Sequence, residues 1–243
     1  MKLCALIPSY NHHTKLGTIT ERLFALHLPV ILVDDASGPE ASAAMRALAQ
    51  DSRITLVRHE HNQGKGGAVM SGMQEAIRQG YTHALQVDAD GQHDLASIPE
   101  LLAKARQYPN AVISGKPEYD DSIPKGRKYG RYITHFWVWV ETLSFAIEDA
   151  MCGLRVYPLT ACQSLMGKQR LGKRMDFDIE ILVRLYWLGT PSYFVVTPVH
   201  YPQDGLSHFQ PFKDNVRISW LHTRLFFGML VRLPVLLARK YSL

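Results

Sequence analysis

The chain has 243 residues, of which 47% are hydrophobic and 20% are charged, so it is too apolar for intrinsic disorder and long enough for one large globular domain. Its formal net charge of +5 favours an anionic partner, such as a nucleotide, phospholipid head groups or nucleic acid. The three cysteines cannot all pair within one chain and show no zinc-type spacing, which favours a reducing compartment.

The N-terminus does not resemble a targeting segment. The stretch MKLCALIPSYN has too short an apolar run for a signal peptide, and Pro8 interrupts it. No segment offers the ~20 uninterrupted apolar residues that a spanning helix needs. We therefore expect a cytoplasmic location.

Short apolar runs alternate with helical periodicity along the first half of the chain. Strands are predicted at 3–7, 30–37, 54–59, 82–90 and 111–116. Helices are predicted at 16–26, 42–50, 66–78 and 95–106. This alternation is typical of βαβ units, so the predicted fold class is α/β, with a mostly parallel central sheet buried on both faces.

The second half is less regular. The segment 120–131 is polar and basic. Helices are predicted at 132–146 and 177–188, strands at 151–158 and 192–202, and a loop at 203–214. We find neither an internal repeat nor a low-complexity linker, which indicates a single domain with a C-terminal appendage.

Three of the predicted strands end in unusual polar segments, which read PSYN, VDDAS and VDADGQ. In open parallel sheets, ligands bind at the carboxyl ends of the strands. We therefore expect these three segments to converge on one crevice.

The third of these segments carries a candidate metal site. Asp88 and Asp90 lie two positions apart, Gly91 permits a tight turn, and Gln92 adds a neutral carbonyl. Mg²⁺ and Mn²⁺ prefer oxygen ligands and are often held by one or two carboxylates together with substrate phosphates. The alternative is a solvated loop, and Asp94 fits that alternative as the N-cap of the following helix.

The segment HNQGKGGAV precedes the predicted helix at 66–78. Gly64, Gly66 and Gly67 allow a ligand to approach the backbone closely at the positive end of that helix, and Lys65 adds a mobile cation. The spacing is not that of a phosphate-binding P-loop.

The segments IPSYN, VDDAS, HNQGKGGAV and VDADGQH occur in this order and resemble the blocks of family 2 glycosyltransferases, which have the GT-A fold. The branch most resembled contains dolichyl-phosphate mannosyltransferases and other polyprenyl-phosphate glycosyltransferases. The resemblance is good over about residues 3–160 and weaker to about 210. It implies a catalytic domain at 1–213, with a nucleotide-sugar-binding half at 1–116 and an acceptor half at 117–213.

By this resemblance Pro8, Tyr10, Asn11 and Asp35 would grip the nucleotide, together with Lys65, Gly66 and Asp88. It also implies that Asp88, Asp90 and Gln92 hold the donor diphosphate through Mg²⁺ or Mn²⁺. The alternative is that Tyr10 packs locally and Asp35 caps the segment that follows it. Many relatives have Glu where His12 stands, so a UDP-linked and a GDP-linked donor are both open.

An inverting glycosyl transfer needs a deprotonated acceptor oxygen, for which the candidate bases are Asp149, Asp178 and Asp176. The segment DAMCGLRVY resembles the block beside the acceptor, in which Arg155 would be structural or phosphate-facing. MDFDIEI resembles a block in which one carboxylate faces the sugar. A strand-like approach would point Asp176 and Asp178 to one side, or either could cap the helix instead.

Further phosphate contacts are predicted outside these blocks. QDGLSHF resembles a loop that closes over the diphosphate, which would place Ser207 and His208 there. Arg127 and Arg131 are also phosphate candidates, and the alternative for them is a solvated basic face.

The segment 214–243 is a predicted basic, amphipathic helical tail. Arg217, Arg224, Arg232 and Arg239 fall on one helical stripe, with apolar residues on the other faces, and Pro234 should kink or break the run. This pattern is typical of an interfacial helix on anionic lipid head groups, so we expect a peripheral contact with the inner face of the membrane. A core helix and an oligomer interface are the alternatives.

These patterns together predict a metal-dependent, inverting glycosyltransferase that uses a nucleotide-sugar donor and a lipid-linked or hydrophobic acceptor at the cytoplasmic membrane face. The main rival is a non-catalytic nucleotide-sugar or lipid-binding protein of the same fold. A nucleotidyltransferase would show a glycine-rich, basic signature near the first strand, which PSYNHH lacks. We expect no nucleic-acid partner, because the positive charge concentrates on an apolar helix.

Overall fold

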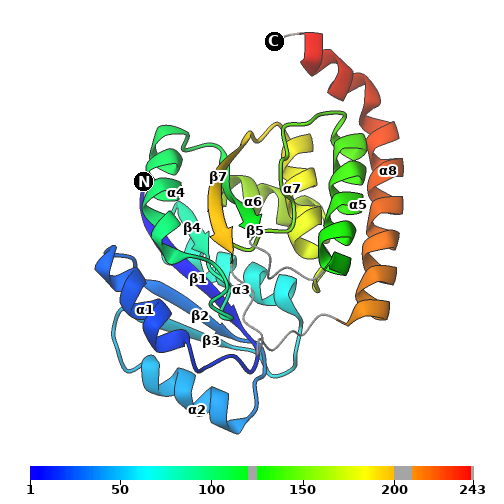
Figure 1. Ribbon diagram of the computed structural model, residues 1–243. Coiled ribbons are helices and arrows are strands. Elements are labelled where there is room, and N and C mark those ends of the chain that lie inside the picture. The colour runs from blue at the N-terminus through cyan, green and yellow to red at the C-terminus, as the bar shows by residue number, and fades with distance from the viewer. Residues whose placement is uncertain (120–124, 200–209, 242–243) are drawn as a thin grey trace.

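The computed structural model describes residues 1–119, 125–199 and 210–241, without the side chains of Lys125, Arg127, Lys240 and Tyr241. Its centre is a seven-stranded sheet in the order β3-β2-β1-β4-β6-β5-β7 (Figure 1). The neighbouring strands run parallel, except that β6 is antiparallel to both β4 and β5. The predicted α/β class with a mostly parallel sheet is confirmed.

The first half of the chain alternates strands with helices, as the sequence predicts. Its strands are β1 (Leu3–Ser9), β2 (Val30–Asp34), β3 (Ile54–Arg58) and β4 (His83–Gln86). Its helices are α1 (Leu16–Ala25), α2 (Pro39–Leu48), α3 (Lys65–Arg78), the short 3₁₀ helix η1 (Leu95–Ser97) and α4 (Ile98–Gln107).

The second half differs more from the prediction. Its strands are β5 (Val112–Tyr119), β6 (Arg155–Pro158) and β7 (Ser192–Val199), and its helices are α5 (Lys125–Thr142), α6 (Leu159–Lys168), α7 (Phe177–Trp187) and α8 (Pro211–Tyr241).

One missed helix and three boundaries correct the sequence prediction. The helix α6 is absent from the prediction, because its buried residues are only Leu159, Cys162 and Leu165. The helix α5 begins seven residues before the predicted position 132, within the basic segment. The strand β4 ends at Gln86 rather than at 90, and β6 begins at Arg155 rather than at 151. The predicted end of β7 at 202 and most of the loop at 203–214 lie outside the described residues.

The sheet carries a hydrophobic core on each face (Figure 1). The helices α1, α2 and α4 cover one face, and their apolar residues pack with those of the strands in one cluster. The helices α3, α5, α6, α7 and α8 cover the other face in a second cluster. The carboxyl ends of β1, β2 and β3 are in register, with Ser9 paired to Asp34 and Asp34 to Arg58, so the polar segments that follow meet at one edge.

The C-terminal helix α8 belongs partly to the core. Leu221, Leu225 and Met229 are buried against the domain, and α8 packs beside α5. Pro234 does not end the helix, contrary to one of the two predicted outcomes, and α8 bends toward its C-terminus in Figure 1. By length and composition alone, Pro211–Arg239 could cross a membrane. Of its most apolar stretch of 18 residues, 28% is buried in the protein. The domain boundary at 213 stays a prediction.

Candidate active site

The end of β1 lies beside the loop that follows β2. The side-chain oxygen of Asn11 accepts a 2.8 Å hydrogen bond from the Gly38 N–H, and the Asn11 N–H donates to the Ser37 hydroxyl at 2.9 Å. Pro8 is buried within the strand, and Tyr10 is half-buried. These contacts join two of the three polar segments into one surface, as the sequence predicts.

Asp35 holds the loop that leads from β3 into α3. It is only 2% exposed. Its Oδ2 accepts a 2.7 Å hydrogen bond from the Gly64 N–H, and its Oδ1 accepts one of 2.8 Å from the Gln63 N–H and lies 2.7 Å from His59 Nδ1. Both carboxylate oxygens are therefore engaged with the protein, but not as the capping alternative predicts, because the segment after β2 is capped by Asp34, whose Oδ1 accepts a 2.8 Å hydrogen bond from the Ser37 N–H. A direct contact with the nucleotide stays a prediction.

The two acids of the DADGQ segment follow β4 on a tight turn. Asp90 Oδ1 accepts a 3.0 Å hydrogen bond from the Gln92 N–H, and Gly91 adopts a φ of +65°, which favours glycine. Asp88 packs against Gly153, where a Cβ atom would lie 1.9 Å from Asp88 Oδ2. The segment MCGLR, which by the family resemblance lies beside the acceptor, thus contacts the first acid through Gly153.

Lys65 joins Asp88 to Asp178. Its Nζ lies 2.9 Å from Asp88 Oδ2 and 2.8 Å from Asp178 Oδ2. Burial opposes the charge on Lys65, but the carboxylates of Asp178 and Asp88 raise its pKa above the ordinary value. Burial likewise would raise the pKa of Asp88, but Lys65 and His93 hold it far below the usual range. Lys65 and Asp88 are therefore both charged at neutral pH.

A chain of buried polar residues lies beneath this pair of acids. The Gln86 amide donates to Asp88 Oδ1 at 3.3 Å, and the Tyr157 hydroxyl donates to Gln86 Oε1 at 3.3 Å. Arg155, which is fully buried, donates to the Tyr157 hydroxyl at 3.1 Å and to the backbone oxygen of Asp178 at 3.0 Å. Sequence analysis did not single out Gln86 or Tyr157, although a glutamine inside an otherwise apolar strand is a usable signal.

Asp149 is enclosed by donors. Arg131 donates to its two oxygens at 2.7 and 2.8 Å, and the backbone N–H groups of Met151 and Cys152 each donate to Oδ1 at 2.8 Å. His135 Nε2 lies 3.2 Å from Oδ2. Burial would raise the pKa of Asp149, but His135 and Arg131 hold it well below the usual range. A carboxylate so saturated is a poor proton acceptor.

Asp176 and Asp178 do not lie on a strand. Residues 175 and 176 form a turn, α7 begins at Phe177, and Asp176 occupies the N-cap position without a capping hydrogen bond from its side chain. The predicted strand-like alternation is therefore wrong, because the first turn of α7 follows at once. Burial raises the pKa of Asp176. Asp178 Oδ1 is buried and has no hydrogen-bond partner among the described residues.

The remaining predicted residues are only partly placed. Ser207 and His208 lie outside the described residues, and so does the side chain of Arg127. Arg131 lies on α5, with its guanidinium 5.3 Å from the ring centre of Tyr119.

Comparison with known proteins places the chain in a family. The profile described as Glycosyl transferase family 2 matches residues 4–171, which is more than half of the chain. The chain belongs to glycosyltransferase family 2. It is therefore a glycosyltransferase, as the four ordered sequence blocks predict.

Two relatives of this glycosyltransferase carry names from the branch that the blocks resemble. The polyprenol monophosphomannose synthase of Mycolicibacterium smegmatis is 32% identical over 229 residues, which cover 87% of this chain and 82% of that protein. The undecaprenyl-phosphate mannosyltransferase of Micrococcus luteus is 33% identical over 195 residues, covering 78% and 79% of the two chains.

Solved structures confirm the GT-A fold of the glycosyltransferase. A glucosyl-3-phosphoglycerate synthase from Mycobacterium tuberculosis, crystallised with Mn²⁺ and UDP-glucose, superposes with a TM-score of 0.66 at 13% identity, over 94% of this chain and 78% of that one. TarS of S. aureus, in complex with UDP-GlcNAc, gives a TM-score of 0.61 at 13% identity, over 93% and 66% of the two chains.

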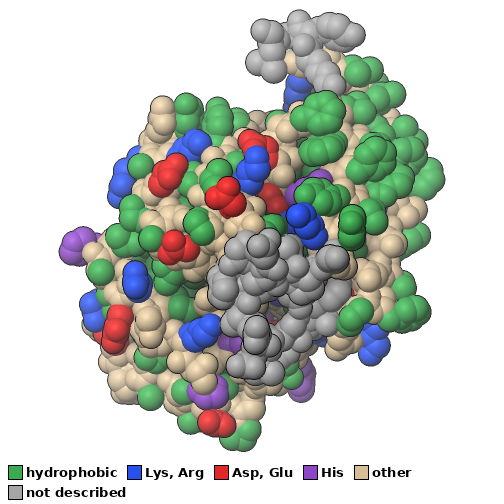
Figure 2. All heavy atoms as spheres, viewed as in Figure 1, with side chains coloured by type: hydrophobic (Ala, Val, Ile, Leu, Met, Phe, Trp, Pro, Cys, Tyr) green, Lys and Arg blue, Asp and Glu red, His purple; other side chains and the backbone are tan. Residues whose placement is uncertain are grey.

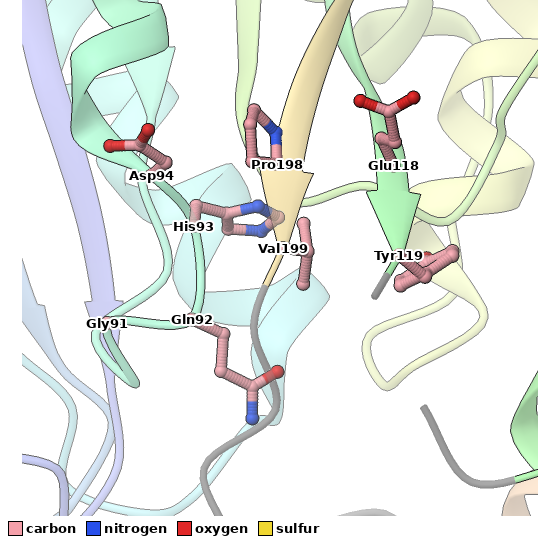
Figure 3. Close-up of a pocket in the computed structure, with 8 residues that line it drawn as sticks. All are labelled: Gly91, Gln92, His93, Asp94, Glu118, Tyr119, Pro198 and Val199. Atoms are coloured by element: carbon pink, nitrogen blue, oxygen red, sulfur yellow. The ribbon is translucent and has the colours of Figure 1, made fainter. Parts of the chain in front are cut away.

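A cavity of about 540 Å³ opens beside the acids of this glycosyltransferase (Figure 3). The imidazole of His93 extends across it toward Val199, and its Nε2 lies 3.9 Å from Asp88 Oδ2. The other residues that line it are Gly91, Gln92, Asp94, Glu118, Tyr119 and Pro198. Asp94 also accepts a 2.9 Å hydrogen bond from the Ala96 N–H, so its predicted capping role is confirmed.

The DADGQ turn carries residue types that suit a hard divalent cation arriving with a ligand, and metal binding there stays a prediction. Asp88, Asp90 and Gln92 supply two carboxylates and one amide oxygen on a single turn. Among the residues that the structure describes, no group of three or more His, Cys, Asp or Glu could hold a metal alone. Mg²⁺ and Mn²⁺ sites of this composition take their remaining ligands from water and from substrate phosphates.

Proposed function

We propose that the protein is an inverting glycosyltransferase that moves a sugar from a nucleoside-diphosphate-sugar donor to a polyprenyl phosphate or similar lipid acceptor. The observation that carries this proposal is that the DADGQ turn lies close to Asp178. The Nζ atom of Lys65 lies within 2.9 Å of a carboxylate oxygen of Asp88, in that turn, and of one of Asp178. The names of the relatives, which include polyprenol, undecaprenyl-phosphate and dolichyl-phosphate enzymes, support the acceptor class.

In the proposed reaction, an acceptor oxygen attacks the anomeric carbon while the bond from that carbon to the diphosphate breaks. Asp88, Asp90 and Gln92 would hold a divalent cation, whose chemistry is to stabilise charge on the departing diphosphate. Lys65 and the N-terminus of α3 face the same charge. A phosphate acceptor is already anionic, so the demand on a general base is small.

Asp178 is the residue that we assign as base where the acceptor carries a proton. Its Oδ1 has no partner among the described residues, whereas both oxygens of Asp149 accept hydrogen bonds from protein donors. Asp149 and Arg131 would instead shape the acceptor side of the site.

We further propose a peripheral contact with the inner face of the membrane, through α8 together with α5. The two helices pack side by side, and large apolar residues cover their outer faces (Figure 2). On α5 the exposed residues include Tyr129, Tyr132, Ile133 and Phe136, and on α8 they include Trp220, Phe227 and Val231. The spacing on each helix places these residues on one stripe.

The charge on these two helices supports an anionic bilayer as the partner. Among their described residues, the only carboxylates are Glu141 and Asp214, which are 0% and 3% exposed. Lys128, Lys213 and Arg217 are exposed cations on the same helices, whereas the other arginines of the predicted stripe are half-buried against the domain, which corrects their predicted contact with head groups: Arg224, Arg232 and Arg239. An apolar surface on two helices whose exposed charged side chains are all cationic, among the described residues, matches the boundary between acyl chains and anionic head groups.

A turnover assay tests the proposed activity. Purified protein is incubated with Mn²⁺ or Mg²⁺, a polyprenyl phosphate, and UDP-linked or GDP-linked sugars, and release of the nucleoside diphosphate is followed. We expect acceptor-dependent turnover that a chelator abolishes. Asp90→Asn should abolish turnover without loss of folding, whereas full metal-dependent activity of that variant would refute the metal site. Binding of donor without turnover in any combination would favour the rival, a non-catalytic binding protein.

A further inference from the structure

Two acids of the proposed site share one ammonium group. The Lys65 Nζ lies within 2.9 Å of one oxygen of Asp88 and one oxygen of Asp178. Among the described residues, Lys65 is the only cationic side chain paired with the Asp178 carboxylate, since Arg155 reaches only its backbone oxygen. The side chains of Lys65, Asp88 and Asp178 are 17%, 18% and 7% exposed, so water screens this cluster poorly.

Lys65 is also placed to leave this position. It is the first residue of α3, directly after Gly64, and the N-terminus of a helix attracts phosphate groups. A diphosphate bound there would offer the ammonium a second anionic partner. Asp88, by contrast, is held by the protein at Gly153 and by Gln86, so it stays in place when Lys65 moves.

We propose that Lys65 is a positioning residue that couples metal binding to diphosphate binding. Without donor, its ammonium offsets part of the negative charge of Asp88 and Asp178, so a free divalent cation must compete with it for Asp88. When the donor diphosphate binds, Lys65 turns from the carboxylates to the phosphate oxygens, and Asp88 becomes available to the cation. The enzyme therefore takes up the metal together with the donor. This inference rests on the metal site of the proposed function.

The proposal has a reciprocal consequence. If the diphosphate tightens binding of the cation, the cation must tighten binding of the diphosphate by the same factor. Removal of Lys65 should reduce this coupling to the part that direct bonds from phosphate oxygens to the cation supply. It should also tighten binding of the free cation, because two acidic groups would then lack their counter-charge. A lysine with only a structural role would, when removed, weaken metal binding or leave it unchanged.

Calorimetric titration with Mn²⁺, with and without UDP or GDP, tests these consequences. In the wild type we expect the nucleoside diphosphate to tighten Mn²⁺ binding by about tenfold or more. In Lys65→Met, Mn²⁺ alone should bind about tenfold tighter than in the wild type, and the nucleoside diphosphate should tighten Mn²⁺ binding by a clearly smaller factor than in the wild type. Lys65→Arg should behave like the wild type. Weaker or unchanged binding of Mn²⁺ alone to Lys65→Met would overturn the proposal.

Two further variants keep the test decisive. In Asp178→Asn, Asp88 is the only acid left to pair with Lys65, so Mn²⁺ without nucleotide should bind more weakly than in the wild type. Unchanged binding would count against the proposal. This variant therefore keeps the proposal testable even if Lys65→Met does not fold. Lys116→Met removes an ammonium that pairs with Glu148 at 2.6 Å outside the site, and it should change neither quantity. Absence of Mn²⁺ binding to the wild type in both conditions would refute the metal site itself, a result distinct from failure of the Lys65 coupling.

Discussion

The backbone N–H of Gly64 donates a 2.7 Å hydrogen bond to Oδ2 of Asp35, which follows the end of β2. This bond connects the ends of two segments that each resemble a nucleotide-binding block. It fixes the turn at Gly64, whose φ of +88° favours glycine, and thereby aims the N-terminus of α3 at the crevice. Lys65, the next residue, depends on that turn for its position between Asp88 and Asp178.

The main expected effect of Asp35→Ala is therefore a loss of folding stability rather than a direct loss of a nucleotide contact. The substitution leaves two backbone N–H groups and His59 without their acceptor, and we expect the free energy of unfolding to fall by about 3 kcal/mol. Urea denaturation measures this loss, and nucleotide titration of the folded variant measures binding. Asp51→Ala, at an exposed ion pair with Arg53, is the control and should change both little. Wild-type stability with lost nucleotide binding would instead mean that Asp35 acts on the nucleotide directly.

Residue patterns predicted the sheet, the polar strand ends and the individual acids, because each is a local feature of the sequence. They could not predict which basic side chain each acid contacts. Asp149 and Arg131 were both selected, as a base and as a phosphate contact, yet they bind each other across 18 residues of sequence. The contact between Lys65 and Asp178 likewise depends on packing of α3 against the start of α7. The first turns of α5 were missed because exposed Lys, Gly and Arg resemble a loop.

Arg131→Ala should destabilise the protein by about 3 kcal/mol, because it leaves the buried carboxylate of Asp149 without its bidentate partner. Lys116→Met breaks an exposed ion pair and should cost at most about 1 kcal/mol. Urea denaturation of the two variants at neutral pH gives the comparison. Equal, small losses would show that the pair of Arg131 and Asp149 adds no more than a surface pair.

The pair of Arg131 and Asp149 also predicts how the stability of the protein depends on pH. His135 and Arg131 lower the pKa of Asp149 in the folded state despite its burial, so its contribution to stability is complete above the unfolded-state pKa of about 4. It is lost as the pH falls toward the lower folded-state pKa. The difference in stability between wild type and Arg131→Ala should thus be constant from about pH 8 to 5 and shrink below about pH 4. A difference that already shrinks between pH 8 and 6 would show that a group other than Asp149 is titrating.

Asp178→Asn should lower kcat by about 100-fold with an acceptor that must lose a proton, and by much less with a phosphate acceptor. The donor KM should change little, since the proposed donor contacts remain. Steady-state kinetics with both acceptor types separates these cases. Asp149→Asn is the comparison. We expect this variant to be less stable, but to keep the wild-type kcat when kcat is calculated per folded molecule. The reverse pattern would exchange the roles assigned to the two acids.

The outer faces of α5 and α8 should bind anionic vesicles. Val231 and Trp220 are 81% and 62% exposed on α8, and Ile133 is 62% exposed on α5. Val231→Asp, Trp220→Asp and Ile133→Asp each place a negative charge on a surface whose exposed charges are cationic, so each should weaken flotation with vesicles of phosphatidylglycerol and phosphatidylcholine. Point substitutions are preferable to truncation before residue 214, because Leu221, Leu225 and Met229 belong to the core.

The control for this surface is Val196→Asp, which alters an exposed valine on β7 and should float like the wild type. Stability of all four variants should stay within about 0.5 kcal/mol of the wild type, because each site is a surface position. If binding is peripheral, raised salt should weaken it, since salt screens the attraction to head groups. An alkaline carbonate wash should also release the protein from cell membranes, since high pH removes positive charge from lysine side chains. Resistance to that wash would show that α8, which is long enough to cross a bilayer, spans it instead.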